Sequence, residues 1–77
     1  MAINLKQGIP GIVADVLSAA GRSMCVEEIA DELDRLGVVH ARRTTREAAS
    51  AALAKRKKQV GDVETVMRGY WRKRVEG

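Results

Sequence analysis

A mostly α-helical domain, made of three helices and a small C-terminal β-hairpin, is the fold class that the sequence predicts. The chain has 77 residues, which is enough for one domain with one small core. In three segments, apolar residues recur every three or four positions, as they do on the buried face of a helix. After Gly61 the period changes to the alternation of a half-buried strand. Because the chain has no Phe, we expect an aliphatic core.

An apolar stripe with helical period predicts the first helix at about residues 9–20. Pro10 lies in its first turn, where the missing N–H costs little, and Gly21 follows as a residue able to take the left-handed conformation that ends a helix. Residues 1–8 lack such a pattern and are expected to form a loose arm, so that the domain proper covers residues 9–77. The stripe consists of Ile9, Ile12, Val13, Val16, Leu17 and Ala20.

The second helix is expected over residues of about 26–36, after a brief strand within residues 22–25, and Gly37 ends it. Its buried stripe is Val26, Ile29, Ala30, Leu33 and Leu36. Its other face carries the acids Glu27, Glu28, Asp31, Glu32 and Asp34. Three of these acids lie in its first half, where they favour the positive end of the helix dipole.

The third helix is expected over residues of about 45–58, after a connection at residues 38–44. Thr44 and Glu47 have the spacing of a capping box, in which a hydroxyl and a carboxylate each bind a free amide at the helix start. Arg56 falls on the inner side, so its polar end must reach the surface or the helix must fray before it. The inner stripe is Ala48, Ala49, Ala52 and Leu53, and the opposite arc holds Arg46, Ser50, Ala54 and Lys57.

The hairpin is expected over residues of about 63–75, with its turn at Arg68-Gly69. Gly69 supplies the positive φ that such a turn needs. In the second strand, Trp71 shares a face with Lys73, and Tyr70 lies on the other face. We expect Trp71 to point inward, because it is the largest apolar side chain available.

Composition argues against several classes of function. Cys25 is the only cysteine, so an internal disulfide or a multi-thiolate zinc site is excluded. Together with His40 it offers too few ligands for a metal and no orienting third group for nucleophilic catalysis, so we expect neither an enzyme nor a cofactor. No apolar run approaches about 20 residues, and the N-terminus does not read as a signal peptide. We therefore expect a cytoplasmic protein without a membrane partner.

Charge is divided unevenly along the chain. Residues 1–41 carry three basic and six acidic residues, a net charge of −3, whereas residues 42–77 carry eleven basic and four acidic residues, a net charge of +7. Such polarity suggests an anionic partner, nucleic acid first. The alternative is a solvated basic surface that keeps the protein soluble.

The order of these elements resembles that of the winged helix-turn-helix family, and it is similar to the HARE-HTH subtype. Residues 16–30 (VLSAAGRSMCVEEIA) look like that family's first helix, first strand and start of the second helix. Residues 44–58 match the recognition helix and residues 63–75 the wing, so the resemblance covers roughly residues 9–75. Two features depart from it: Cys25 stands where Ser or Thr usually caps the second helix, and the connection at residues 38–44 is longer than a tight turn.

The resemblance implies a small transcriptional regulator that reads duplex DNA with its third helix and wing. Arg46 and Ser50 are then the candidates for base contacts, and Thr44 and Thr45 suit a phosphate at the helix N-terminus. The remaining expected DNA contacts, mostly to phosphates, are Arg42, Arg43, Lys57, Lys58, Arg68, Arg72 and Arg74.

Two other functions stay open. A winged helix can serve as a protein-interaction module, and here the acidic second helix would bind a basic partner or a second copy of the chain. RNA binding is a third possibility, although a single exposed Tyr70 offers little base stacking. Duplex binding at low salt distinguishes the DNA-binding function from the interaction module.

Overall fold

The computed structural model describes residues 3–38 and 44–74. Within these ranges the chain forms the three helices and the hairpin that the sequence predicts, and the short strand before the second helix joins the hairpin in a three-stranded antiparallel sheet. The elements in chain order are α1 (Ile9–Ala20), β1 (Met24–Cys25), α2 (Val26–Arg35), α3 (Thr45–Gln59), β2 (Val63–Met67) and β3 (Tyr70–Lys73). The predicted helix limits are confirmed to within one residue.

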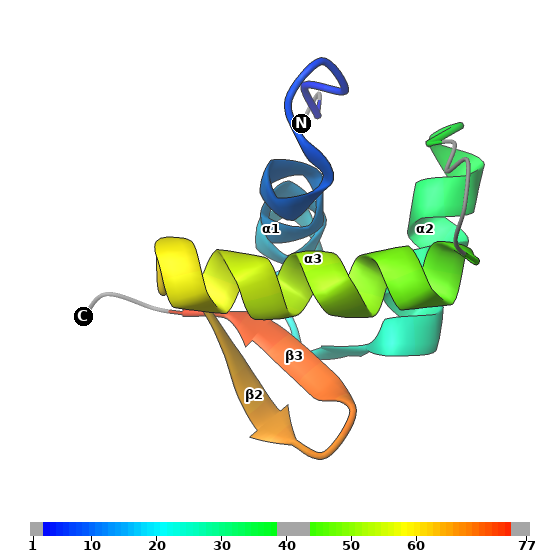
Figure 1. The fold of residues 1–77 in the computed structure, drawn as a ribbon. Coiled ribbons are helices and arrows are strands. Elements are labelled where there is room, and N and C mark those ends of the chain that lie inside the picture. Colours follow the sequence, from blue (N-terminus) through cyan, green and yellow to red (C-terminus); the bar gives the residue numbers. More distant parts are fainter. Residues whose placement is uncertain (1–2, 39–43, 75–77) are drawn as a thin grey trace.

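Helix α3 lies across α1 and α2 and packs against both, while α1 and α2 touch each other less (Figure 1). The strand order is β1-β3-β2, so the hairpin is extended by the short strand that precedes α2. Trp71 of β3 lies opposite Met24 of β1 on one side and Thr65 of β2 on the other. The register of β2 and β3 shifts between Thr65 and Met67, close to the turn. The hairpin thus projects from the C-terminal end of α3 (Figure 1).

The core is aliphatic, as expected. Its largest fully buried side chains come from all three helices and from β2: Ile12, Val13, Leu17, Ile29, Leu33, Leu53 and Val63. Helix α3 contributes the small residues Ala49 and Ala52, which let its backbone approach the other two helices closely. Trp71 is half-buried and packs against this cluster, which confirms its predicted inward direction. In the described ranges, no polar or charged residue is buried.

Helix ends follow the local signals in the sequence. Gly21 adopts a φ of 64° after α1, and its amide donates to the carbonyl of Leu17 at 3.2 Å. At the start of α2, the amide of Cys25 donates to the carboxylate of Glu28 at 3.3 Å. Hydrogen bonds from Arg22 and then from this amide lower the pKa of Glu28. The Glu28 carboxylate therefore caps the free amide of Cys25, which is the carboxylate's half of a capping box.

The corner between α3 and β2 is joined by an ion-pair cluster that the sequence did not predict. Arg56 donates two hydrogen bonds of 2.8 Å to the carboxylate of Asp62, and Lys73 donates a third of 2.8 Å. The Arg56 guanidinium, followed by Lys73, holds the pKa of Asp62 well below its usual range. Because Asp62 pairs with Arg56, α3 continues past this inward-facing residue to Gln59 without fraying.

The N-terminal arm contacts the domain at two described points. Ile3 is half-buried and packs against the core, and Gln7 donates a hydrogen bond to Asp15 of α1. Leu5 is exposed. None of the helices in the described parts of the chain is long and apolar enough to cross a membrane.

Candidate nucleic-acid interface

The outer face of α3 is open to solvent. Arg46, Ser50, Ala54 and Lys57, which the helical period placed on one arc, are all exposed. Arg46, Ser50 and Ala54 line a shallow depression together with Glu47 and Ala51. The small side chains between Arg46 and Lys57 leave the helix surface accessible to a partner as broad as a nucleic-acid groove.

Lys57 connects this helix face to the hairpin. Its ammonium group lies 5.9 Å from the centre of the Trp71 ring, within the range of a cation–π contact. Lys58 is exposed one residue further along. A groove between the end of α3 and the hairpin is lined by Lys57 and Arg74 with Glu64 and Thr65. The C-terminal end of α3 and the base of the hairpin therefore share one surface that is mainly cationic.

Along the hairpin, the three predicted arginines differ in their surroundings. Arg72 donates to Glu64 on the neighbouring strand at 3.0 Å, and this pair is exposed. Arg68 lies in the turn between β2 and β3, and Arg74 follows β3; both are exposed. In the described residues, no ion pair includes Arg68 or Arg74. A phosphate could accordingly approach these two guanidinium groups without displacing any carboxylate of the described residues.

The N-terminal end of α3 is occupied by carboxylates. The hydroxyl of Thr44 accepts a hydrogen bond from the amide of Glu47 at 3.2 Å, which confirms that half of the capping box, and it donates to the Glu47 carboxylate at 2.9 Å. The hydroxyl of Thr45 donates to Asp34 of α2 at 2.7 Å. Arg46 lies 3.7 Å from Glu27, also of α2. Acids of the second helix therefore border the region where the sequence placed a phosphate.

Most of the predicted residues within the described ranges are exposed, and Lys57 and Arg74 line one groove. Ser50, Lys57, Lys58, Arg68 and Arg74 are exposed. Arg46 and Arg72 are exposed but paired with acids, and Thr44 and Thr45 have acidic partners. Arg42 and Arg43 lie outside the described residues, as does His40. The sequence predicted the acidic face of α2. It did not predict which end of α3 this face would contact, because the crossing of the two helices depends on the connection at residues 38–44.

Sequence reasoning did not predict an apolar surface on the hairpin. Val66, Met67 and Tyr70 are 47%, 61% and 39% exposed, and they lie just before and just after the Arg68–Gly69 turn. The alternating pattern places side chains on two faces of a strand, but it cannot show that a two-stranded projection has solvent on both. Three exposed apolar side chains close to one turn are a feature that suits contact with a protein partner.

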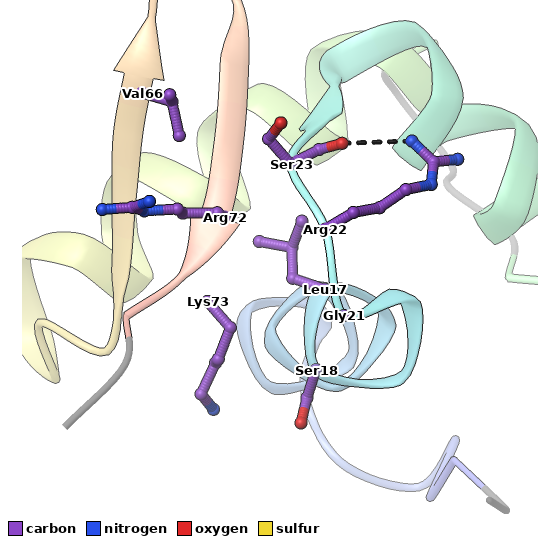
Figure 2. A pocket seen from close by; sticks show the side chains of 8 residues that line it. All are labelled: Leu17, Ser18, Gly21, Arg22, Ser23, Val66, Arg72 and Lys73. Atoms are coloured by element: carbon purple, nitrogen blue, oxygen red, sulfur yellow. Dashed lines mark hydrogen bonds between the residues drawn. The ribbon is translucent and has the colours of Figure 1, made fainter. Parts of the chain in front are cut away.

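A second groove, of about 380 Å³, lies between the end of α1 and the hairpin (Figure 2). Its lining includes three cations, but Arg22 is paired with Glu28, Arg72 with Glu64, and Lys73 with Asp62. Figure 2 shows Arg22 and Arg72 extending in opposite directions, away from the groove. The groove therefore does not present converging charges to an anion.

Comparisons with protein-family models, with curated proteins and with solved structures returned no match. In the residues that the structure describes, no group of three or more His, Cys, Asp or Glu side chains could hold a metal ion. The candidate site is therefore the exposed basic residues of α3 and the hairpin.

Proposed function

We propose that this chain is a non-catalytic, cytoplasmic DNA-binding module of the winged-helix kind, which acts as a small transcriptional regulator. Helix α3 enters the major groove with its exposed arc, and the hairpin contacts the backbone or the minor groove beside it. The observation that supports the proposal is the contact of Lys57 with the Trp71 ring at 5.9 Å, because it places a cation of α3 against the hairpin. Arg74 lines the same groove as Lys57, and Lys58 and Arg68 are exposed on α3 and in the hairpin turn.

The test is binding to duplex DNA measured by fluorescence anisotropy over a range of salt concentrations. If about four to six basic side chains meet phosphates, log K falls against log salt with a slope of roughly −4 to −5. The double variant Lys57→Gln/Lys58→Gln should weaken binding to every duplex and reduce the slope by about two. Lys6→Gln, which removes one exposed charge from the N-terminal arm, is the control and should leave the slope unchanged.

An interaction module is the second candidate, and the exposed apolar cluster at Val66, Met67 and Tyr70 favours it. In that case the acidic face of α2 and the hairpin bind another protein or a second copy of the chain. Analytical ultracentrifugation at high and low salt, with and without duplex DNA, distinguishes the interaction module from the DNA-binding module. A salt slope near zero together with concentration-dependent association would support the interaction module and contradict DNA binding.

A further inference from the structure

Two carboxylates of α2 face the first turn of α3. Asp34 accepts a hydrogen bond of 2.7 Å from the hydroxyl of Thr45, and Glu27 lies 3.7 Å from the guanidinium of Arg46. These acids are seven residues apart, or about two helical turns, so they share one face of α2. The start of α3 thus lies against two negative side chains of the same chain.

These contacts use groups that a phosphate would need. A carboxylate can only accept, so the hydroxyl proton of Thr45 is directed at Asp34, and the hydroxyl proton of Thr44 is directed at Glu47. Neither hydroxyl can donate to a phosphate while it keeps its present partner. A negative side chain at a helix N-terminus also interacts favourably with the positive end of the helix dipole. This is the same attraction that would otherwise favour a phosphate there. Asp34 therefore takes the place of an external anion.

We infer that Asp34 and Glu27 are specificity-determining residues that keep the nucleic-acid backbone away from the N-terminal end of α3. This inference rests on the proposed DNA-binding function and concerns the same surface. Phosphates are then held at the other end of α3 and on the hairpin, by Lys57, Lys58 and Arg74. Arg46 leaves Glu27 only for a contact that is better than this exposed pair, such as the two acceptors of a guanine.

The physical reason for this selectivity is the difference between the two possible partners of Arg46. Its pair with Glu27 is weak, because both side chains are about 70% exposed, at 68% for Arg46 and 70% for Glu27. A guanine edge accepts two hydrogen bonds from a guanidinium and carries no net charge, so Glu27 repels it less than it repels a phosphate. A phosphate accepts similar hydrogen bonds but is repelled by both carboxylates. Asp34 and Glu27 therefore disfavour contacts of the N-terminal end of α3 with the DNA backbone more than they disfavour contacts with bases.

The experiment compares Asp34→Asn and Glu27→Gln with the unmodified chain. Anisotropy gives the affinity for a duplex selected from a random pool with the unmodified chain and for a scrambled duplex, at two salt concentrations. Each variant should bind the scrambled duplex about two- to fivefold more tightly, the range expected for releasing one exposed pair. The ratio of selected to scrambled affinity should fall, and the salt slope should become steeper by up to about one.

Two controls make the same charge change elsewhere on α2. Asp31→Asn removes an exposed acid for which no side-chain hydrogen bond or ion pair is found in the described residues. Glu32→Gln breaks an ion pair with Arg35 that does not involve α3. Both should tighten scrambled binding less than Asp34→Asn and Glu27→Gln do, and both should keep the affinity ratio. Thermal melting of each variant checks that the fold is retained.

The outcomes separate this inference from the proposed function. If all four variants tighten binding equally, the cause is net charge and the inference is overturned. If the unmodified chain discriminates between duplexes and neither Asp34→Asn nor Glu27→Gln changes the ratio, the inference also fails while the DNA-binding function stands. If no variant binds any duplex, the proposed function itself fails. Thr45→Val, which removes the hydroxyl but keeps the Asp34 charge, should not tighten scrambled binding; a gain equal to that of Asp34→Asn would contradict the role of the carboxylate.

Discussion

Asp62 is the residue on which the junction of α3 and the hairpin depends most. Its carboxylate is about four-fifths buried and accepts hydrogen bonds from Arg56 and Lys73, which come from two different elements. The hydrogen bonds from Arg56 and Lys73 outweigh the loss of hydration and favour the ionised form of this carboxylate. The charge at this position is thus structural, although it lies within the basic half of the sequence.

Asp62→Asn should lower the free energy of unfolding at neutral pH by about 1–3 kcal/mol, because it weakens charge-assisted hydrogen bonds and leaves two cations without their partner. The pKa of Asp62 is lower in the folded chain than its ordinary value, so its contribution is present above about pH 4 and is lost as the pH falls further. Urea unfolding at several pH values measures this. Below about pH 4 the unmodified chain should lose stability more steeply than the variant; parallel curves would contradict the assignment.

Arg46 and Arg68 should respond differently to replacement by Ala. Arg46 lies on the outer arc of α3, so Arg46→Ala should cost about 1–3 kcal/mol of binding at a selected site and relax the sequence preference. Arg68 lies in the hairpin turn, so Arg68→Ala should weaken all duplexes alike and lower the salt slope by about one. Both are exposed and should change folding stability by no more than about 0.5 kcal/mol. Binding to a selected and a scrambled duplex at two salt concentrations checks this; the opposite pattern would reverse the roles of helix and hairpin.

At the scale of elements, α3 differs from the other helices because small residues form its inner face. Ala49 of α3 is fully buried in the core, whereas Ala54 on the opposite side of the helix is exposed. The close approach of α3 to both neighbours requires that there be no longer side chain at Ala49. The same residue type therefore has opposite packing requirements on the two sides of one helix.

Ala49→Leu should destabilise the fold by about 1–3 kcal/mol, since the added atoms must displace well-packed neighbours. Ala54→Leu is the matched control and should leave the free energy of unfolding within about 0.5 kcal/mol of its original value. Chemical denaturation measures both. Under the proposed function, Ala54→Leu should instead weaken duplex binding, because it adds bulk to the exposed arc. Equal stability losses would mean that α3 packs with a different face inward.

The sequence predicted helix limits well because they depend on local signals, such as Pro10 and Gly21 around α1 and Thr44 before α3. It also predicted which side chains of α3 are exposed, because a helical period determines them. It could not predict that Asp34 contacts Thr45 or that Arg56 contacts Asp62, since both contacts depend on how separate elements cross or turn. The prediction of a phosphate site at the start of α3 therefore did not take into account the acidic side chains of α2 that lie beside it.

For the whole molecule, the N-terminal and C-terminal halves of the chain depend on each other. Strand β1, which precedes α2, pairs with β3 at the far end of the chain. Val63 is fully buried with residues of the helices, and Trp71 covers the same core from the hairpin. A domain of this size has little stability to spare. We therefore expect the helices and the hairpin to fold as one cooperative unit.

A chain truncated after Gln59 should fail to melt cooperatively, because it lacks the strand that pairs with β1, the buried Val63 and the partner of Arg56. Circular dichroism against temperature measures this, with the full chain as reference. The expected result is a broad, shallow loss of helical signal. A sharp transition in the truncated chain would show instead that the three helices form a stable domain without the hairpin.

The contact between Lys57 and Trp71 gives the protein an optical reporter of its own. The chain contains a single Trp, so its indole emission comes from one place, the point where helix and hairpin meet. A polyanion that draws the ammonium group away from the ring alters the electric field at the indole and hence the colour and intensity of its emission. Titration of unlabelled DNA into unlabelled protein can then be followed by fluorescence alone. Lys57→Met, which keeps the length of the side chain but not its charge, shows how much of that response belongs to the departing cation.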